Sequence, residues 1–228
     1  MSKEAFNPLV EIRKYFQYLQ DLGYSLVPNC KEFSLKMANG LTSKEADLLD
    51  FFETLSLCQD CGLYRTRKQT VIDKNFNQQD IMLVGEYPSR EDDFNGYPLS
   101  GSIREHLQKM LLSIGLRVED FYTSLVVKCK PPYGRLPEEE EISLCKRHLL
   151  REITLLRPKL ILAFGNLPPR ALLGESESII TVRGKPFKFR ESVIIFTYHP
   201  NYMQKNPAVK RLIWEDLKTF KKLYESLK

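Results

Sequence analysis

Four of the five cysteines are spaced as ligands of one metal or redox centre. Cys58 and Cys61 form the motif CQDC, and Cys129 and Cys145 follow after 67 and 15 intervening residues. A CxxC motif alone serves zinc binding, thiol exchange and iron–sulfur clusters alike. Four thiolates suffice for a tetrathiolate site; one close pair and one wide pair fit structural zinc less well, although the spacing does not exclude it. The simpler alternative is four unrelated buried cysteines, and Cys30 has no partner in the pattern.

Two other residues that could do chemistry stand at the ends of apolar runs. Glu86 comes directly after Gly85 in IMLVGE, and His199 ends VIIFTYH before a proline. A lone histidine is more often structural than catalytic. In an open parallel sheet, however, ligands bind outside the carboxyl ends of the strands, where both side chains would face one crevice. We therefore expect Glu86 and His199 to belong to one site.

Strands that alternate with helices must position these residues. Four short apolar runs without polar alternation, typical of strands buried on both faces, cover 81–85, 124–129, 160–165 and 193–200. Helical patterns cover 103–114, 137–156, 166–173 and 207–226, and 174–192 is predicted as a hairpin or loop. The alternation indicates an α/β fold, a three-layer α/β/α arrangement with a central four-stranded, mainly parallel sheet.

The N-terminal residues are predicted to form an addition to this core. Residues 4–22 space their apolar side chains as an amphipathic helix does, and 24–42 are predicted as a linker. A second helix is expected to begin near Thr42. Because 228 residues suffice for one sizeable core, we predict an N-terminal helical extension and linker over 1–42 and one domain over 43–228.

Composition and charge restrict the class of protein only loosely. The chain carries 34 basic and 29 acidic residues, a formal charge of +5 and a pI near 8.8, which is compatible with a polyanionic partner. No apolar run approaches the roughly 20 residues of a membrane helix, and the first residues lack a signal-peptide pattern. We expect a soluble, cytoplasmic monomer, nucleoid-associated in a prokaryote, in which reducing conditions favour metal ligation over disulfides.

Several sequence blocks follow one another in order between about residues 43 and 220. They are CxxCxL with Arg67, VGExP, EDDFNGYP, VVKCxPP, Cys145, RPKLILAFG, RG, TYHPxY with NP, and a late WxDL. In this order the blocks resemble the iron–sulfur uracil-DNA glycosylases, which are family 4 of the uracil-DNA glycosylase superfamily. The resemblance implies an N-glycosyl hydrolase of base excision repair, whose partner is DNA containing a damaged base.

The resemblance also implies roles for individual residues. A [4Fe-4S] cluster would be held by Cys58, Cys61, Cys129 and Cys145. Glu86 would position water or stabilise positive charge on the sugar, and His199 would donate a hydrogen bond to the base oxygen as negative charge develops there. Asn201, Tyr202 and Met203 match the loop that enters the DNA, with Tyr202 or Met203 as a wedge.

The predicted base pocket beside Gly85 departs from the family in three places. Tyr87 stands where the family usually has Gly or Ala, and its ring could narrow or close the pocket. Leu99 replaces an aromatic residue that stacks on uracil, and Leu125 replaces an asparagine that reads the uracil edge. Loss of a polar reader removes hydrogen bonds that can discriminate between bases by orders of magnitude.

Three functions follow from this combination. The first is a glycosylase for uracil or a related deaminated base; the second is a catalytically impaired, DNA-binding relative acting as a damage sensor or as an accessory of a repair or polymerase complex. The third is an active enzyme re-targeted to another lesion. Basic residues near the motifs are candidates for phosphate contacts: Arg65, Arg67, Lys68, Lys128, Lys130, Arg135, Lys185, Lys188, Lys205 and Lys210.

Overall fold

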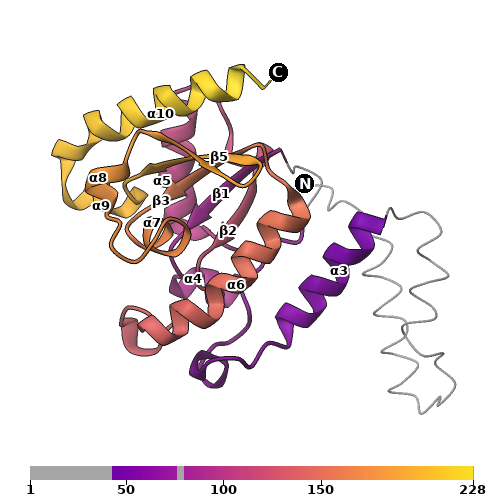
Figure 1. The fold of residues 1–228 in the computed structure, drawn as a ribbon. Coiled ribbons are helices and arrows are strands. Elements are labelled where there is room, and N and C mark those ends of the chain that lie inside the picture. Colours follow the sequence, from indigo (N-terminus) through magenta and orange to yellow (C-terminus); the bar gives the residue numbers. More distant parts are fainter. Residues whose placement is uncertain (1–42, 76–79, 228) are drawn as a thin grey trace, which may run out of the picture. The chain divides into compact units, whose positions relative to one another are not determined.

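The computed structural model of the protein describes residues 43–75 and 80–227 (Figure 1). The chain divides into two compact units, Met1–Ala46 and Asp47–Lys228, and the sheet belongs to the second. The predicted helix over 4–22 and the linker over 24–42 lie outside the described residues.

A single sheet with the strand order β2-β1-β3-β5-β4 forms the centre of the second unit. Its strands are β1 (Ile81–Gly85), β2 (Tyr122–Leu125), β3 (Leu160–Phe164), β4 (Pro186–Phe189) and β5 (Ser192–Thr197). The first three and β5 run parallel, whereas β4 pairs antiparallel with β5. The α/β fold is confirmed, but the sheet has five strands rather than the predicted four.

The additional strand, β4, comes from the segment predicted as a hairpin or loop. Its side chains alternate between exposed and half-buried, and it begins with Pro186, which cannot donate a backbone hydrogen bond. Both features are tolerated at a sheet edge, and they make the segment unlike the apolar central strands. A search for continuous apolar runs therefore misses it.

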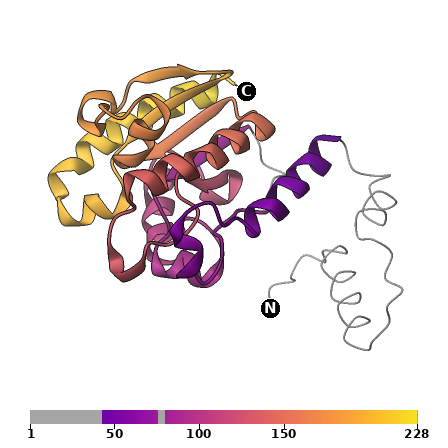
Figure 2. The ribbon, with the colours of Figure 1, turned by 60° about the horizontal axis from the view of Figure 1, so that its bottom comes forward.

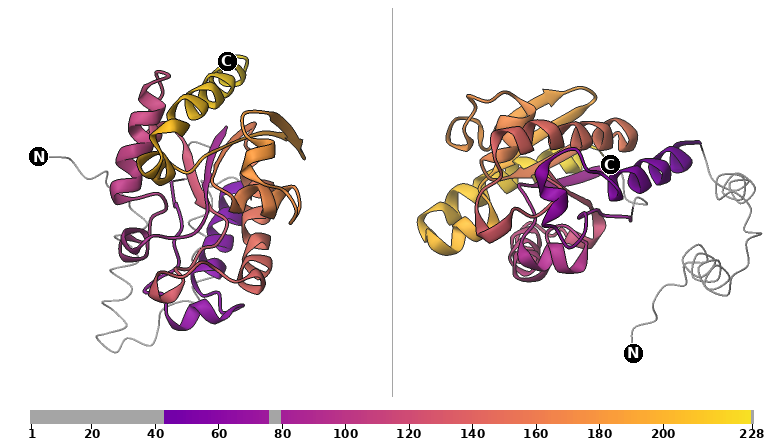
Figure 3. Two further views of the ribbon diagram at one scale, coloured as in Figure 1. Left: turned by 90° about the vertical axis from the view of Figure 1, so that its left-hand side faces the viewer. Right: turned by 90° about the horizontal axis from the view of Figure 1, so that it is seen from below.

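The two faces of the sheet are covered by different helices, as the views in Figures 2 and 3 show. Met82 and Val84 pack in one apolar cluster, and their neighbours Ile81 and Leu83 pack in the other. This is the alternation expected of a strand buried on both faces. The first face is covered by α3 (Ser43–Ser56), α6 (Glu139–Leu156), α7 (Leu167–Leu172) and α8 (Ile179–Val182), and the second by α5 (Gly101–Leu112) and α10 (Lys210–Glu225).

Short helices occupy the connections. They are α4 (Arg90–Asn95), α9 (Pro200–Lys205) and the 3-10 turns η2 (Gly62–Arg65), η3 (Val118–Asp120), η4 (Pro132–Gly134) and η5 (Pro207–Val209). Helix α4 begins with a capping box in which Ser89 and Asp92 each accept a backbone N–H of the other. The fully buried Asp92 carboxylate also accepts from Ser100 N at 2.6 Å and Ser100 Oγ at 2.7 Å, so it closes the loop between β1 and α5.

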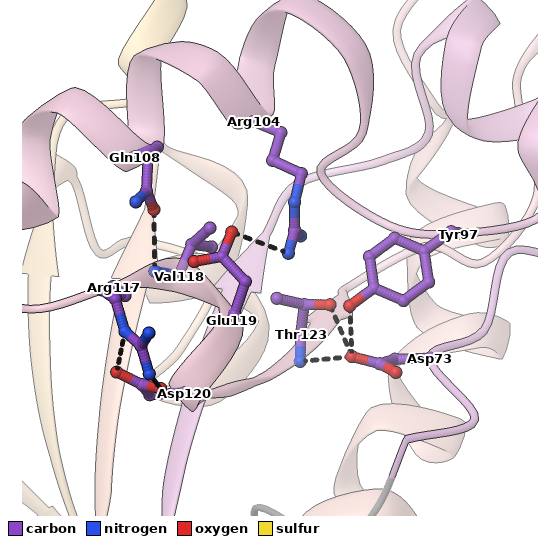
Figure 4. A network of polar contacts seen from close by, with 9 residues as sticks. All are labelled: Asp73, Tyr97, Arg104, Gln108, Arg117, Val118, Glu119, Asp120 and Thr123. Carbon is purple, nitrogen blue, oxygen red and sulfur yellow. Dashed lines mark hydrogen bonds and ion pairs between the residues drawn. The ribbon is translucent and has the colours of Figure 1, made fainter. Parts of the chain in front are cut away.

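A second buried carboxylate fixes the outer side of β2. Asp73 accepts hydrogen bonds from the backbone N–H and hydroxyl of Thr123, at 3.0 and 2.7 Å, and from the Tyr97 hydroxyl at 3.0 Å (Figure 4). Burial raises the pKa of Asp73, and these donors act in the opposite direction. The loop that carries Leu99 is thereby anchored at Tyr97.

Among the helices that the structure describes, none is both long and apolar enough to span a membrane.

Candidate functional site

Glu86 is held rigidly at the carboxyl end of β1. Its Oε1 accepts the backbone N–H of Asn166 at 2.9 Å and of Leu167 at 3.1 Å, where the chain leaves β3. Gly165, at φ +94°, lies so close that a Cβ there would stand 2.4 Å from the Glu86 carboxyl carbon. The sequence FGN thus forms a backbone cradle for this carboxylate, in a conformation that favours glycine.

The environment of Glu86 acts on the pKa of its carboxyl group in two opposite directions. Burial raises its pKa above the usual value, and the two backbone N–H donors oppose that shift by stabilising the ionised form. A carboxylate set in this way can orient water or oppose developing positive charge.

His199 stands at the carboxyl end of β5 as the first residue before α9. Its Nδ1 accepts the backbone N–H of Asn201 at 3.3 Å, so it serves as the N-cap of that helix. Burial lowers the pKa of His199 to about 4, which leaves the ring neutral at physiological pH. With Nδ1 as acceptor, the ring proton lies on Nε2, and the side chain is a neutral hydrogen-bond donor.

Strand β3 lies between the strands that carry Glu86 and His199. Gly165 N donates to Thr197 O at 2.9 Å, so the cradle of Glu86 is bonded to β5 two residues before His199. Both predicted catalytic side chains therefore belong to one continuous edge of the sheet, at the carboxyl ends of its parallel strands.

A buried ion pair fixes the end of β5. Asp216 on α10 accepts from the Arg183 guanidinium at 2.6 and 3.2 Å and from the Thr197 hydroxyl at 2.7 Å. Arg183 also donates to Leu212 O at 2.6 Å, and its guanidinium lies 5.7 Å from the Tyr198 ring centroid. The RG and WxDL motifs thus hold the residues that precede His199, a role that sequence reasoning missed although both motifs were visible.

Two leucines fill the predicted pocket beside Gly85. Leu99 and Leu125 are each only 1% exposed, and a Cβ built on Gly85 would stand 2.7 Å from both side chains. Leu99 has a φ of +53°, which is uncommon for a residue other than glycine. Tyr87 is half-buried against the apolar cluster that contains Met82 and Val84. Burial, together with the nearby Glu86 charge, raises the pKa of its hydroxyl. In this structure the space above Gly85 is apolar and closed.

The two candidate wedge residues, Tyr202 and Met203, have different environments on helix α9. Met203 packs against the apolar cluster that contains Ile81 and Leu83. Tyr202 is 45% exposed, and its ring lies 5.4 Å from that of Tyr198, measured between centroids. Asn201 is half-buried, and Lys205 is exposed at the end of the helix. Of the two side chains, the more exposed Tyr202 is therefore the better placed to contact a partner outside the protein.

The four cysteines predicted as ligands line one cavity, with an empty volume of ≈ 290 Å³ including space open to solvent. Cys58 and Cys61 precede η2, Cys129 follows β2, and Cys145 lies in α6. Two donors point at the sulfurs: Arg67 Nη1 lies 3.0 Å from Cys129 Sγ, and Lys128 N lies 3.2 Å from Cys145 Sγ. N–H groups directed at sulfur stabilise thiolates, and metal-bound cysteine sulfurs commonly accept such hydrogen bonds.

Burial disfavours the ionised form of three of these thiols. Burial raises the pKa of Cys58 to about 11 and of Cys145 to about 12, and it also raises the pKa of Cys129. A cation in the cavity would reverse this, since a coordinating thiol loses its proton. The four predicted ligands therefore share one cavity and are not scattered through the core.

Polar residues that sequence reasoning missed lie at the solvent side of the cavity. His148 Nε2 lies 3.4 Å from Cys58 Sγ and 3.1 Å from Asp60 Oδ2, and these three groups could themselves hold a metal ion. Hydrogen bonds from Cys58 and Arg147 lower the pKa of Asp60 to about 2. The signal was available, because His148 follows Cys145 by three residues on a helix and so shares its face.

Several basic residues predicted to contact DNA are engaged with the protein itself. Arg67 binds Cys129 and Ser56 O, and Arg135 forms a two-bond ion pair with Glu141 at 2.6 and 2.8 Å. Lys130 Nζ donates to Pro131 O at 3.3 Å. The prediction that Lys128 contacts DNA was wrong, because Lys128 is only 1% exposed and its side chain cannot reach a phosphate.

Comparison with known proteins gives consistent matches. Residues 74–218 match the model of the uracil DNA glycosylase superfamily. The chain is 36% identical over 180 residues to a type-4 uracil-DNA glycosylase of Sulfurisphaera tokodaii, which covers 75% of this chain and 82% of the relative. A type-4 uracil-DNA glycosylase of Thermotoga maritima is 34% identical over 173 residues, or 74% of this chain and 90% of the relative. A DNA polymerase of Bacillus phage SP01 is 28% identical over 146 residues, which is 64% of this chain but 16% of the polymerase.

Proposed function

Because the chain belongs to the uracil DNA glycosylase superfamily, we propose that it is a uracil-DNA glycosylase of base excision repair. Its substrate is uracil, or a related deaminated base, in DNA. The observation that carries the proposal is the placement of a fixed carboxylate and a neutral imidazole donor at the carboxyl ends of β1 and β5, on either side of β3. These are the two groups that cleavage of a glycosidic bond needs.

The reaction breaks the bond between the base nitrogen and C1′ of the sugar and adds water to C1′. The nucleotide first leaves the duplex, because its reacting atoms are not accessible in the stack. As the bond lengthens, negative charge develops on the base, where His199 Nε2–H can donate a hydrogen bond, and positive charge develops on the sugar, opposite the Glu86 carboxylate. The same carboxylate can orient the attacking water.

We propose that Cys58, Cys61, Cys129 and Cys145 hold a [4Fe-4S] cluster. Supporting this, all four line one cavity, and N–H donors point at two of the sulfurs. When bound, the cluster supplies a rigid structural centre and no chemistry at the base. Glu86 O accepts from Val127 N at 3.0 Å, two residues before Cys129, so the ligand segment is bonded to the backbone of the catalytic edge.

The spacing of the sulfurs supports a cluster over a single zinc ion. Four thiolates on one zinc at about 2.3 Å would lie within about 4.6 Å of one another. Among the described residues, no three of the four cysteine sulfurs lie within 4.8 Å of one another. Ligands that surround several irons are necessarily farther apart.

DNA is proposed to lie along the carboxyl edge of the sheet as far as α9. There the exposed Tyr202 is suited to enter the space that the flipped base leaves, with Asn201 and Lys205 beside it. Because a repair enzyme acts on the chromosome, we propose that the protein works in the cytoplasm, in association with the nucleoid in a prokaryote. We also propose that it is a monomer.

Incubation with a uracil-containing duplex, followed by alkali, tests the function. The wild-type protein is expected to produce strand breaks at uracil and none in the same duplex with thymine. Glu86→Gln and His199→Asn should slow the reaction, while Glu191→Gln, on the exposed turn between β4 and β5, should not. A wild-type protein that retains its metal but leaves uracil intact would refute this function.

A second candidate, a relative that is impaired or re-targeted, is favoured by one observation. Leu99 and Leu125 close the space above Gly85 and offer no hydrogen bond to a base edge. The similarity to a phage DNA polymerase is compatible with an accessory role. The variant Leu125→Asn separates the candidates: a gain of uracil cleavage over an inactive parent would favour the second, and cleavage by the parent itself favours the first.

A further inference from the structure

A fully buried lysine lies beneath the cysteine cavity and has no part in the reaction described above. Lys128 is 1% exposed, and its Nζ lies 2.5 Å from both Glu152 Oε2 and Ser124 Oγ. The hydroxyls of Tyr122 and Ser124 donate to Glu152 at 2.6 and 2.7 Å. All four side chains are at most 1% exposed, so this is a closed network of one cation, one anion and two hydroxyls.

The network joins the two segments that carry Cys129 and Cys145. Tyr122 and Ser124 belong to β2, which ends at Leu125, and the chain then runs through Lys128 to Cys129. Glu152 belongs to α6, two turns beyond Cys145. The Lys128 backbone N–H donates to Cys145 Sγ at 3.2 Å, and Lys128 is one of the residues that line the cavity. Lys128 therefore contacts both ligand segments.

The cation of the pair belongs to the residue directly before Cys129, whereas the anion, Glu152, lies two turns from Cys145 along α6. A buried ion pair is seldom more stabilising than an apolar pair of the same volume, because both ions lose their water. Its stability alone does not explain why a charged pair occupies this part of the core.

The cavity supplies a reason. Four cysteinate ligands bring four formal negative charges into a largely buried site. Net charge and hydrogen bonds near the sulfurs are among the protein's means of setting the reduction potential of an iron–sulfur cluster. The buried ammonium group of Lys128, the residue directly before Cys129, would offset part of that charge.

We propose that the Lys128–Glu152 pair is a positioning and charge-balancing element for the metal centre, which fixes the spacing of Cys129 and Cys145 and raises the reduction potential of the bound [4Fe-4S] cluster. This inference rests on the proposed cofactor. Removal of Lys128 alone would leave Glu152 buried without a counter-charge, which is expected to unfold the protein rather than report on the cluster.

The test therefore replaces both partners with apolar side chains of similar length, Lys128→Met with Glu152→Met. The matched control is Arg183→Met with Asp216→Met, which removes the buried ion pair at β5, where none of the residues lining the cysteine cavity is involved. Iron and sulfide content, the cluster reduction potential and the rate of iron loss to a chelator are measured on the holoprotein. Far-UV circular dichroism confirms the fold of each variant.

We expect the Lys128–Glu152 double variant to fold, to show a more negative reduction potential and to lose iron at least tenfold faster than wild type. The Arg183–Asp216 control should keep the wild-type potential. Conservative replacement by Lys128→Arg should keep the potential closer to wild type than the double variant does.

Two results would overturn the inference, and they differ in what else they overturn. If the wild-type protein holds iron and the double variant keeps both its potential and its rate of iron loss, the inference is wrong and the cofactor stands. If the wild-type protein purified without air holds zinc or no iron, the proposed cofactor fails and the inference fails with it.

Discussion

Glu86 and His199 show how a residue's environment selects its chemistry. Sequence position alone placed both at strand ends, and the structure keeps them there. The sequence could not reveal that the backbone N–H groups of Asn166 and Leu167 bind Glu86, because these residues are 80 and 81 positions away along the chain. Nor could it reveal which nitrogen of His199 carries the proton, since this depends on the N-cap bond to Asn201.

Replacement of Glu86 by Gln should slow uracil excision by roughly 10²–10⁴-fold, the usual contribution of such a group. Gln can still accept the two backbone N–H bonds, so the fold should be unchanged. Because burial raises the Glu86 pKa, the wild-type rate should fall on the acid side at a pH above the usual value of 4.5. Single-turnover rates as a function of pH check this, and persistence of the same acid limb in Glu86→Gln would contradict it.

The lowered pKa of His199 predicts a pH dependence of stability. The unfolded chain binds a proton near pH 6.5, whereas the folded protein binds it only near pH 4. Stability should therefore fall as the pH drops from about 6.5 to about 4, by up to about 3 kcal/mol from this residue. Urea unfolding at several pH values measures it.

His199→Asn is the control for that measurement, because Asn can cap α9 but does not titrate. Its unfolding free energy should lose this part of the pH dependence. Equal slopes for the two proteins between pH 4 and 6.5 would mean that another group is responsible.

At the scale of elements, apolar periodicity identified the central strands well and the edges poorly. Strands β1, β3 and β5 lie where continuous apolar runs predicted them, because burial on both faces leaves no other pattern. Strand β2 spans Tyr122–Leu125 and not the predicted 124–129, because two of its four residues, Thr123 and Ser124, are polar but satisfied in buried networks. Such compensation depends on partners from distant segments and is invisible in a local window.

The Arg183–Asp216 pair can be tested through the glycine beside it. Gly184, at φ +70°, leaves room for Asp216, and a Cβ there would stand 2.4 Å from Asp216 Oδ1. Gly115 has a similar φ of +76° but no atom within 4 Å of its Cβ position. Gly115→Ala should thus lose about 1 kcal/mol of unfolding free energy for its backbone conformation alone.

Gly184→Ala should lose about 2 kcal/mol more than Gly115→Ala, because the ion pair must also shift. It should also slow uracil excision, since Thr197 and Tyr198 precede His199. Urea unfolding and single-turnover assays provide both readouts. Equal losses of stability in the two variants would show that the ion pair tolerates displacement.

At the scale of the whole molecule, its mild positive charge makes DNA affinity depend on a few local contacts. Each phosphate contact releases counterions, so affinity should fall steeply between 50 and 200 mM salt. Lys205→Ala should lower the slope of log affinity against log salt by about 1. Lys159→Ala, at the amino end of β3, should leave the slope unchanged. A wild-type affinity insensitive to salt would exclude the proposed phosphate contacts.

The order of the parts along the chain has a consequence for biosynthesis. All four cysteines precede β3, which begins at Leu160, whereas His199 and its supports Arg183 and Asp216 follow it. A growing polypeptide that has emerged as far as α6 already holds every ligand of the proposed cluster, together with β1 and β2. If the proposed cluster binds there, it would be held by a sheet with only two of its strands in place, and β3 and β5, which bring the proposed catalytic edge together, would follow afterwards.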